Sequence, residues 1–537
     1  MLPSFSTASI GGLLGSTEDR RAGRRDIAAL ESRTFDVLVV GGGAMGAAVA
    51  RDASLRGLSV ALVEQDDYAQ GTTSRSTRLI HGGLRYLAQR EFGLVRENLR
   101  EREILLRTAP HLVRPLPVHV PLYRASVRRR ATLRAGMFLY DLLSRRKSLP
   151  RRRWIPRERL LALEPGLAAE GLRGAWRFYD AQCQLVERLV VENVVDAVAN
   201  GALALNHVRV ARWLREDEAI AGAEVEDRLS GRTLRVRARE TVNATGAWLD
   251  LVGPRTAPLL RLTKGVHLVL PRASSSAFLH FHTDGRPIFV LPWLEGSLVG
   301  TTDTDFSGDP SEARPEASDV AYLVDAAKRI FPRASIDRVA YAYAGVRALI
   351  RVSGVREGQV PREHEIRDHA TSDGLRGIVS IVGGKLTAYR GIAQEATDLV
   401  AKRLGNRARC LTKTRSLPGA GDPGSLDATL PAAQRERLVR VYGTRARAVL
   451  ARLDRKGDVL RAEVALAVAE EGAATLSDFL LRRSCLGLAL DRALPLVDAA
   501  ARALSAELGW SEARRDEEMA SYRAEVRAES SALSRPA

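Results

Sequence analysis

The chain has 537 residues, 45% of them hydrophobic and 27% charged, a composition typical of folded proteins that excludes mostly disordered and collagen-like chains. The length suggests about three domains, and no stretch approaches 18 consecutive apolar residues, so a membrane-spanning helix is not expected. Lysine and arginine (82) exceed aspartate and glutamate (64) by a net charge of +18, which favours an acidic partner: nucleic acid, anionic lipid or a phosphorylated substrate.

The N-terminal residues 1–33 are expected to form a flexible extension. They lack the apolar core of a secretory signal, and Glu18, Asp19 and Asp26 make their arginine cluster unlike a transit peptide. A short helix is predicted over Arg24–Glu31.

A nucleotide-binding unit is predicted directly after this extension. The apolar run Phe35–Val40 indicates a buried parallel strand, and it leads into glycines spaced as G-x-G-x-x-G at Gly41, Gly43 and Gly46. A helix over residues 47–56, a second strand over residues 58–63 and Glu64 follow in order. The glycines permit a tight turn, a close approach to a pyrophosphate and helix packing, while an acid at Glu64 binds ribose hydroxyls and favours NAD or FAD over NADP.

Two later segments favour FAD. Thr241–Gly246 is an apolar strand end followed by Ala-Thr-Gly, and Gly377–Arg390 again has the order strand, Gly-Gly and helix. Three separated segments that return to one site are typical of FAD, which is usually held by several discontinuous pieces of chain.

Gly71–Leu87 (GTTSRSTRLIHGGLRYL), taken with the front motif, resembles the aerobic, membrane-associated FAD-dependent glycerol-3-phosphate dehydrogenases. The resemblance continues through Glu101–Leu112, Lys264–Leu270, Gly300–Asp303, Gly345–Arg347 and Gly383–Arg390. It implies an α/β fold: a doubly wound, two-dinucleotide-binding FAD domain, an antiparallel-sheet substrate or cap domain, and a C-terminal helical domain. It also implies FAD as cofactor, glycerol 3-phosphate as substrate and quinone as electron acceptor.

The resemblance assigns cofactor-binding residues beyond the front motif. Together with that motif they are Gly41, Gly43, Gly46, Glu64, Thr72, Thr73, Ser76, Gly82, Gly246, Gly384, Lys385, Leu386 and Thr387. It places the substrate among Arg85, Tyr86, Arg347, Arg362 and Lys385. Asp303, which follows an apolar strand, is expected to line the substrate side or to orient a histidine or an arginine, with a strand-end turn residue as the alternative. Arginine suits a phosphate because its planar fork donates two parallel hydrogen bonds; without the resemblance these cations would be ordinary surface residues.

The base that accepts the hydroxyl proton is predicted to be His81 or His267, which with Arg347 and Lys385 make up the predicted catalytic set. Both histidines stand beside glycine in apolar motifs, and imidazole titrates near neutrality. No metal site is expected. His364 and His369 are five residues apart where a helical pair needs four, and Cys183, Cys410 and Cys485 show no ligand spacing, so they are expected to be free thiols in a reducing compartment.

Several departures from the family pattern leave alternatives open. The Cys183–Leu189 segment lacks the paired acids common in the family, and Ala348 and Ala388 replace a usual proline and threonine. Glycerol 3-phosphate therefore leads, with another polyol phosphate as the alternative. An oxidase of the same fold and a non-catalytic flavin-binding membrane protein are the other hypotheses.

Residues 124–159 contain 13 arginines and lysines against two acids. Between these cations lies the apolar segment Leu133–Leu143, so a helix with Phe138 and Tyr140 in an anionic membrane surface is predicted, with Trp154 at the headgroups. A solvated loop and nucleic-acid binding are the alternatives, and no zinc knuckle or aromatic-rich motif supports the latter. The expected location is cytoplasmic, peripheral on the inner face of the cell membrane.

The predicted domain limits follow from these segments. The FAD domain comprises residues 34–110 with parts of 170–260 and 345–405, and the substrate domain comprises 111–170 and 261–344. A Gly/Pro-rich linker over 406–427, a helical domain over 428–527 and a disordered tail over 528–537 complete the chain. A homodimer is also expected.

Overall fold

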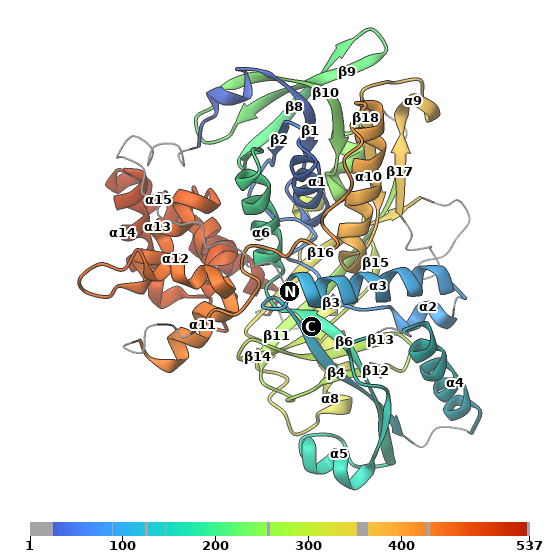
Figure 1. Cartoon of the computed structure of the whole chain (residues 1–537). Helices are drawn as coiled ribbons and strands as arrows, with labels where there is room; N and C mark the ends of the chain where they lie inside the picture. The colour runs from blue at the N-terminus through green and yellow to red at the C-terminus, as the bar shows by residue number, and fades with distance from the viewer. Residues whose placement is uncertain are drawn as a thin grey trace, which may run out of the picture.

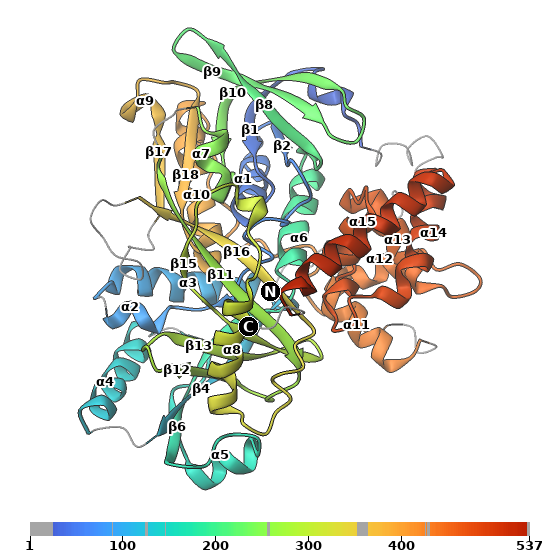
Figure 2. The same ribbon diagram turned by 180° about the vertical axis from the view of Figure 1, so that it is seen from behind.

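The computed structural model describes residues 25–88, 90–123, 127–144, 147–254, 258–351, 364–424, 426 and 430–533, without the side chains of residues 85, 88, 127–130 and 132. Two β-sheets form the body of the molecule, and the C-terminal helices stand beside α6 (Val186–Ala199), away from α2 and α4 (Figures 1 and 2). The predicted α/β architecture with a parallel FAD sheet, an antiparallel sheet and a C-terminal helical region is confirmed.

The first sheet has the central order β17-β18-β10-β1-β2-β7, and its β1, β2, β7, β10 and β18 pair in parallel. Its strands are β1 (Thr34–Val40), β2 (Val60–Val63), β7 (Leu203–Leu205), β8 (Val208–Glu216), β9 (Ala219–Asp227), β10 (Thr233–Asn243), β17 (His364–Asp368) and β18 (Ile378–Gly383). The front motif forms as predicted, with α1 (Ala44–Leu55) between β1 and β2.

The two faces of this sheet are covered differently, because successive side chains of a strand point to opposite sides. Val37 and Val39 pack in the core that includes residues of α1, α6 and α10 (Tyr389–Arg403). Leu38 and Val40 pack in a second core with residues of β8, β9 and β10. Helices therefore cover one face, and an antiparallel strand unit covers the other.

The second sheet has the order β15-β11-β14-β13-β12-β4-β6-β3, with β16 paired to β11 and β5 to β6. All its pairs are antiparallel except β12 with β4. Its strands are β3 (Leu79–Ile80), β4 (Val113–Tyr123), β5 (Arg153–Pro156), β6 (Leu172–Cys183), β11 (Leu260–Pro271), β12 (Ala277–Phe281), β13 (Pro287–Trp293), β14 (Gly296–Gly300), β15 (Thr304–Asp305) and β16 (Tyr341–Ile350). Strands β6 and β16 thus belong to this sheet, although their residues fall mostly in the ranges assigned from the sequence to the FAD domain.

The remaining helices divide between the sheets and the C-terminal region. Around the sheets are α2 (Leu84–Ala88), α3 (Phe92–Thr108), α4 (Val127–Leu143), α5 (Arg157–Leu163), α7 (Leu249–Val252), α8 (Ala317–Ile330) and α9 (His369–Ser372). The C-terminal group comprises α11 (Ala432–Tyr442), α12 (Ala446–Leu450), α13 (Val459–Glu471), the π-helical turn η7 (Asp478–Arg483), α14 (Val497–Leu508) and α15 (Glu512–Ser530). The predicted disorder from residue 528 is wrong for its first part, since α15 runs to Ser530 and a 3-10 turn covers Ser531–Leu533.

The predicted apolar helix exists as α4, but the two aromatic residues expected at a membrane differ in orientation. Phe138 is 56% exposed, whereas Tyr140 is buried with its hydroxyl donating to the Asp180 carboxylate (2.8 Å to Oδ1) and accepting from Gly82 N (2.9 Å). The expectation for Tyr140 is therefore wrong, because a partnered phenol inside the protein contributes nothing to an outer surface. Trp154 packs edge-on against Trp176 on the second sheet.

At the N-terminal side, the predicted Arg24–Glu31 helix is only a 3-10 turn at Ala28–Leu30, and residues 1–24 lie outside the described part. Within the described ranges, no helix combines the length and the apolar character needed to cross a membrane.

Candidate active site

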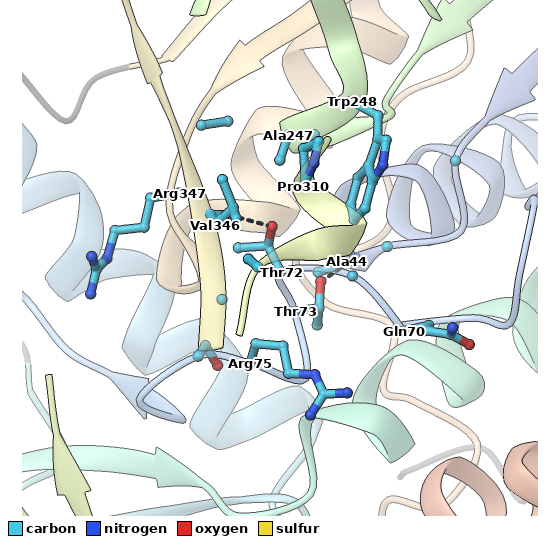
Figure 3. A pocket seen from close by; sticks show the side chains of 18 of the residues that line it. Ala44, Gln70, Thr72, Thr73, Arg75, Ala247, Trp248, Pro310, Val346 and Arg347 are labelled. Carbon is cyan, nitrogen blue, oxygen red and sulfur yellow. Dashed lines mark hydrogen bonds between the residues drawn. The ribbon is translucent and has the colours of Figure 1, made fainter. Parts of the chain in front are cut away.

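A cavity of about 760 Å³ lies where the carboxyl ends of β1, β10 and β18 approach strands β11 and β16 of the second sheet. Ligands of α/β proteins bind at such strand ends because the connecting loops diverge there. Figure 3 shows Thr72, Thr73 and Trp248 on one side of β16 and Arg347 on the other. The cavity is large enough for a dinucleotide's reactive end and a small substrate together.

Two of the three front glycines are required by the fold of the turn itself. Gly41 has φ +104°, and a Cβ there would lie 2.6 Å from the Ala244 carbonyl oxygen. A Cβ on Gly46 would lie 1.8 Å from the Gly41 carbonyl oxygen. These glycines allow α1 and the residues after β10 to close on the turn.

Gly43 is different, because its backbone is extended (φ −74°, ψ −173°) and it caps the N-terminus of α1. A Cβ there would meet only the Thr73 hydroxyl, at an ordinary 3.5 Å. The following N–H, of Ala44, donates to the same hydroxyl (3.2 Å). Gly43 therefore leaves open the space in front of a helix N-terminus, where backbone N–H groups and the helix dipole favour a phosphate.

We expect Gly43→Ala to leave the apoprotein folded and to weaken FAD binding at least tenfold, because the added methyl group faces the phosphate position and not the protein. FAD titration of the apoprotein by flavin fluorescence measures the affinity, and thermal unfolding of the apoprotein measures the fold. Gly93→Ala, an alanine at an open position of α3, is the matched control. Unchanged affinity in Gly43→Ala would exclude this placement of the phosphates.

Glu64 follows β2 and faces the same turn. Its carboxylate accepts the Gly42 N–H (2.6 Å) and the Asp66 N–H (3.0 Å). Burial raises the pKa of Glu64 to about 7, although the two N–H donors oppose that shift. A carboxyl group held against the glycine turn fits recognition of ribose hydroxyls.

Most of the predicted cofactor residues line the cavity. They are Gly41, Gly43, Glu64, Thr72, Thr73, Ser76, Gly246, Gly384, Lys385, Leu386 and Thr387. The other two stand behind the wall: Gly46 packs on the Gly41 carbonyl, and a Cβ at Gly82 would lie 2.6 Å from the Tyr140 hydroxyl. The residues around the cavity thus fit a bound flavin dinucleotide, because the glycine turn and both candidate histidines line the same cavity.

The substrate side of the cavity centres on Arg347 of β16. Its guanidinium donates to Asp303 Oδ1 (2.8 Å), Thr301 Oγ1 (2.9 Å) and the Thr302 carbonyl (3.2 Å). Asp303 does not line the cavity; it orients the arginine from behind. The Arg347 side chain is 20% exposed and lines the cavity, so its oriented guanidinium can receive an anion.

Lys385 and Tyr86 form the second cationic element of the cavity. The Lys385 ammonium lies 3.4 Å from the centre of the Tyr86 ring, and both residues line the cavity. Arg85 is on α2 but its side chain is outside the described part, as is all of Arg362. Of the four predicted cations, Arg347 and Lys385 are therefore the two whose side chains can be placed, and both line the cavity.

His267 on β11 is buried and lines the cavity. Its Nε2 lies 2.8 Å from Thr77 Oγ1, and its ring stacks on Tyr343 with centroids 5.2 Å apart. Its Nδ1 has no hydrogen-bond partner among the described residues. Burial, with a smaller effect of Arg347 and Arg78, holds the pKa of His267 well below the ordinary histidine value, so the imidazole is neutral and can accept a proton.

His81, the other candidate, is partly exposed and also lines the cavity. The Thr387 hydroxyl accepts its backbone N–H (3.0 Å), and its ring lies edge-on to Phe289. Thr387 thus contacts the backbone of His81, whereas Thr77 and Tyr343 contact the ring of His267.

The sequence did not indicate which residues contact His267 or which residues close the cavity on the C-terminal side. Thr77 was inside a quoted motif but had no assigned role, and Tyr343 lies two residues before the quoted Gly345–Arg347. Arg75, in the same motif as Thr77, pairs with Glu529 of α15, which forms part of the cavity wall. No local signal could have linked a charged C-terminal helix to this cavity.

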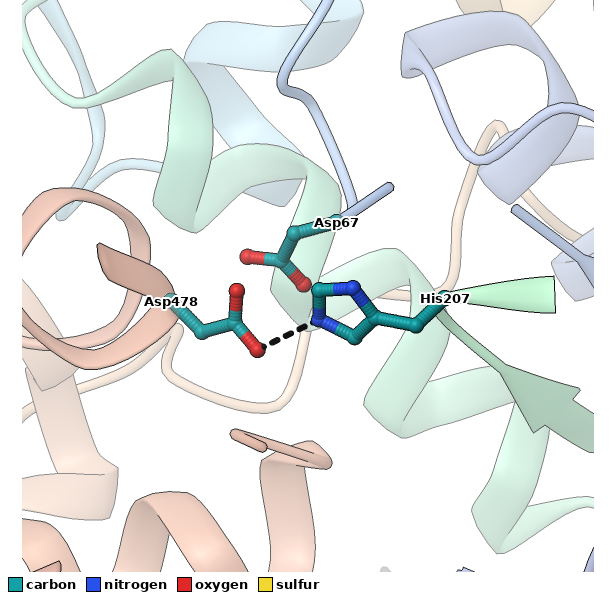
Figure 4. Close-up of side chains that lie close together, drawn as sticks. All are labelled: Asp67, His207 and Asp478. Atoms are coloured by element: carbon teal, nitrogen blue, oxygen red, sulfur yellow. Dashed lines mark hydrogen bonds and ion pairs between the residues drawn. The ribbon is translucent and has the colours of Figure 1, made fainter. Parts of the chain in front are cut away.

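Asp67, His207 and Asp478 lie close together (Figure 4), with their ligand-type atoms within 4.8 Å of one another. Their oxygens are already engaged, since Asp67 accepts from Arg482 and Arg483 (2.7 and 2.8 Å for Arg483), and Asp478 accepts from His207 (2.9 Å). Burial alone would lower the pKa of His207, but the neighbouring Asp478 carboxylate raises it above the ordinary histidine value. The cluster is an ion-pair network that joins the C-terminal helices to the FAD-binding unit.

The fold and the cavity define a flavin-dependent oxidoreductase. Residues 36–390 match the model of the family described as FAD dependent oxidoreductase, and residues 410–515 match the C-terminal domain of alpha-glycerophosphate oxidase. The cofactor is FAD.

Comparison with individual proteins narrows the class. The chain is 36% identical to the glycerol-3-phosphate dehydrogenase of Synechocystis sp. (93% of this chain and 97% of the relative). It is 37% identical to glycerol-3-phosphate dehydrogenase 2 of Mycobacterium tuberculosis (93% and 89%). The FAD-complexed structure of the Bacillus halodurans glycerol-3-phosphate dehydrogenase superposes with a TM-score of 0.77 at 27% identity, covering 95% of this chain and 98% of that one. The chain belongs to the FAD-dependent glycerol-3-phosphate dehydrogenase family.

Proposed function

We propose that this protein oxidises sn-glycerol 3-phosphate at C2 to dihydroxyacetone phosphate and passes the electrons to quinone. The observation that carries the proposal is that one cavity joins the dinucleotide turn to an oriented guanidinium, Arg347, and a neutral buried imidazole, His267. The relatives named above are glycerol-3-phosphate dehydrogenases, which agrees with this substrate.

Arg347 and Lys385 bind the substrate phosphate. Asp303 and Thr301 hold the Arg347 fork in place, so little side-chain freedom is lost when the anion arrives. Lys385, over the Tyr86 ring, adds a second positive charge at the cavity wall. Arg85 and Arg362 complete this set in the proposal.

His267 accepts the proton of the C2 hydroxyl as that carbon becomes a ketone. Thr77 at Nε2 and the Tyr343 ring keep the imidazole in one orientation. FAD, when bound, supplies the acceptor for the hydride that leaves C2. His81, on the same cavity, is the alternative base or orients the alcohol.

Bleaching of the flavin tests this proposal directly. Anaerobic mixing of the holoenzyme with glycerol 3-phosphate is expected to abolish the oxidised flavin bands, and steady-state turnover with a water-soluble quinone is expected to exceed turnover with oxygen. A flavin that stays oxidised with glycerol 3-phosphate but bleaches with another polyol phosphate overturns the substrate. Faster turnover with oxygen overturns the quinone and favours an oxidase.

The membrane side of the proposal rests on α4. Phe138 and Leu142, one turn apart, are 56% and 40% exposed, while Met137 and Tyr140 pack inward. Exposed cations lie on the chain nearby, Arg134 on α4 and Arg151 and Arg153 after it. An exposed apolar strip with cations around it suits an anionic bilayer surface, where the lipid-soluble acceptor is found. We propose peripheral binding at the inner face of the cell membrane on this basis; the homodimer remains a prediction of the sequence.

We expect the double variant Phe138→Ser/Leu142→Ser to lose most co-sedimentation with anionic phosphatidylglycerol vesicles at low salt, because two apolar side chains no longer enter the interface. Each contributes roughly 1.5–3 kcal/mol when fully buried, so a decrease of at least tenfold in the partition coefficient is expected. Leu494→Ser, at a 45% exposed leucine of the C-terminal helices, is the control. Equal loss in the control, or no binding by the unchanged protein, contradicts the α4 surface.

A further inference from the structure

We propose that Glu529 of the C-terminal helix α15 is a positioning residue for the reaction, acting on His267 through Arg75 and the segment that follows it. The inference rests on the proposed role of His267. It gives the C-terminal helices a part in catalysis beyond completing the fold.

Glu529 is fixed between two cations. Its Oε1 accepts from Arg75 Nη1 and its Oε2 from Arg492 Nη2 (2.5 Å), and the side chain is almost entirely buried. Arg492 is itself held, because its guanidinium lies 4.1 Å from the centre of the Tyr341 ring and its carbonyl accepts the Tyr522 hydroxyl (2.6 Å). Burial alone would raise the pKa of Glu529, but Arg492 and Arg75 lower it, so the group is a carboxylate at neutral pH.

Arg75 connects Glu529 to the cavity wall. It lines the cavity beside Glu529, and its Cβ would lie 2.6 Å from a Cβ on Gly345, two residues before Arg347. Its guanidinium lies 5.9 Å from the centre of the Tyr343 ring. Arg75 is thus packed between α15 and β16. In this proposal its ion pair with Glu529 fixes the position of the segment Arg75–Thr77.

The same segment holds His267 at two points. The Ser76 carbonyl accepts the Tyr343 hydroxyl (3.0 Å), and the Tyr343 ring stacks on His267. The Thr77 hydroxyl lies 2.8 Å from His267 Nε2. Three consecutive residues therefore join Glu529 at one end to both contacts of the imidazole at the other.

Other contacts keep α15 in place independently of Glu529. Glu518 accepts the Leu476 N–H (2.8 Å), and Tyr522 is fully buried. Loss of the Glu529 charge is therefore expected to disturb the Arg75–Thr77 segment and not to release the helix. A positioning role therefore predicts slower flavin reduction in a protein that keeps its fold, whereas a purely structural role predicts a loss of stability.

The test compares Glu529→Gln with Glu529→Asp and with the matched control Glu517→Gln, an exposed glutamate of the same helix that pairs with Arg514 at the surface. Anaerobic stopped-flow mixing with glycerol 3-phosphate measures the limiting rate of flavin reduction and the substrate Kd, while flavin content and Tm measure the fold. We expect Glu529→Gln to reduce the limiting rate about tenfold with Kd and flavin content within twofold, since a displacement near 1 Å costs about 10²-fold. Glu529→Asp, which keeps the charge, should recover part of the rate, and the control should match the unchanged protein.

A double-mutant cycle with Arg75→Gln completes the test. If Glu529 acts through Arg75, the double variant is no slower than Arg75→Gln alone, because the shared step is already lost. An unchanged rate in Glu529→Gln, additive effects in the cycle, or a slow variant that has also lost flavin each overturn the inference. If the unchanged protein is not reduced by glycerol 3-phosphate at all, the proposed function fails instead, and the two failures are distinguished.

Discussion

Replacing His267 by glutamine is expected to slow flavin reduction by glycerol 3-phosphate about 10³-fold while the protein keeps its FAD. A positioned base contributes roughly 10²–10⁴-fold to a proton transfer. Glutamine can still meet the Thr77 hydroxyl, which lies 2.8 Å from Nε2 in the unchanged protein, so the cavity wall should persist. Anaerobic stopped-flow absorbance measures the rate, and the flavin-to-protein ratio checks the cofactor.

The pH dependence gives a second signature of His267. Burial first, and then the charges of Arg347 and Arg78, hold its pKa well below 6.5. A base with a lowered pKa stays unprotonated to lower pH, so the acid limb of kcat/KM should fall below pH 6.5 and not at it. His81→Gln is the comparison. If His81→Gln loses more rate than His267→Gln, or if the acid limb of the unchanged protein disappears only in His81→Gln, the assignment of the base is reversed.

Arg347→Gln is expected to raise KM for glycerol 3-phosphate about 10²-fold with flavin content unchanged. A hydrogen bond to a charged group contributes about 1.5–3 kcal/mol, and about 2.7 kcal/mol corresponds to that factor. The substitution also removes the contacts of the guanidinium to Asp303 and Thr301, so Tm is measured beside KM to show that the fold is kept. Steady-state kinetics are measured with glycerol 3-phosphate and with glycerol. Only the phosphorylated substrate should show the increase in KM.

Arg261→Gln provides the control for Arg347→Gln. Arg261 is also an arginine of the same sheet paired to an aspartate, but its partner Asp305 is half exposed and Arg261 does not line the cavity. Its loss should leave KM unaltered. If Arg347→Gln loses flavin at an unaltered KM, the residue supports the cofactor and not the substrate.

Local patterns predicted the FAD-binding unit well because its signals are local. A strand, a glycine turn, a helix and an acid follow one another between Phe35 and Glu64, and each is determined by its own residues and near neighbours. The antiparallel sheet of the substrate domain was expected only from the family resemblance. Its strand pairing, such as that of β11 with β16, required the fold, since it joins residues far apart in the chain.

The errors occurred where a distant contact decides the outcome. Tyr140 was predicted at a membrane surface from its apolar neighbours, but Asp180 and Gly82 draw it inward. The tail from residue 528 was predicted to be disordered, but Arg75 and Arg492 hold Glu529 in a buried site. Partners of this kind leave no trace in the local sequence.

The Asp67 network also has a consequence for the order in which the protein is completed during synthesis. Asp67 lies three residues after Glu64. Its partners Arg482 and Arg483 are synthesised more than 400 residues later. The contact between the front of the chain and the C-terminal helices is therefore completed only late in translation, once residues 482 and 483 have left the ribosome and can pair with Asp67.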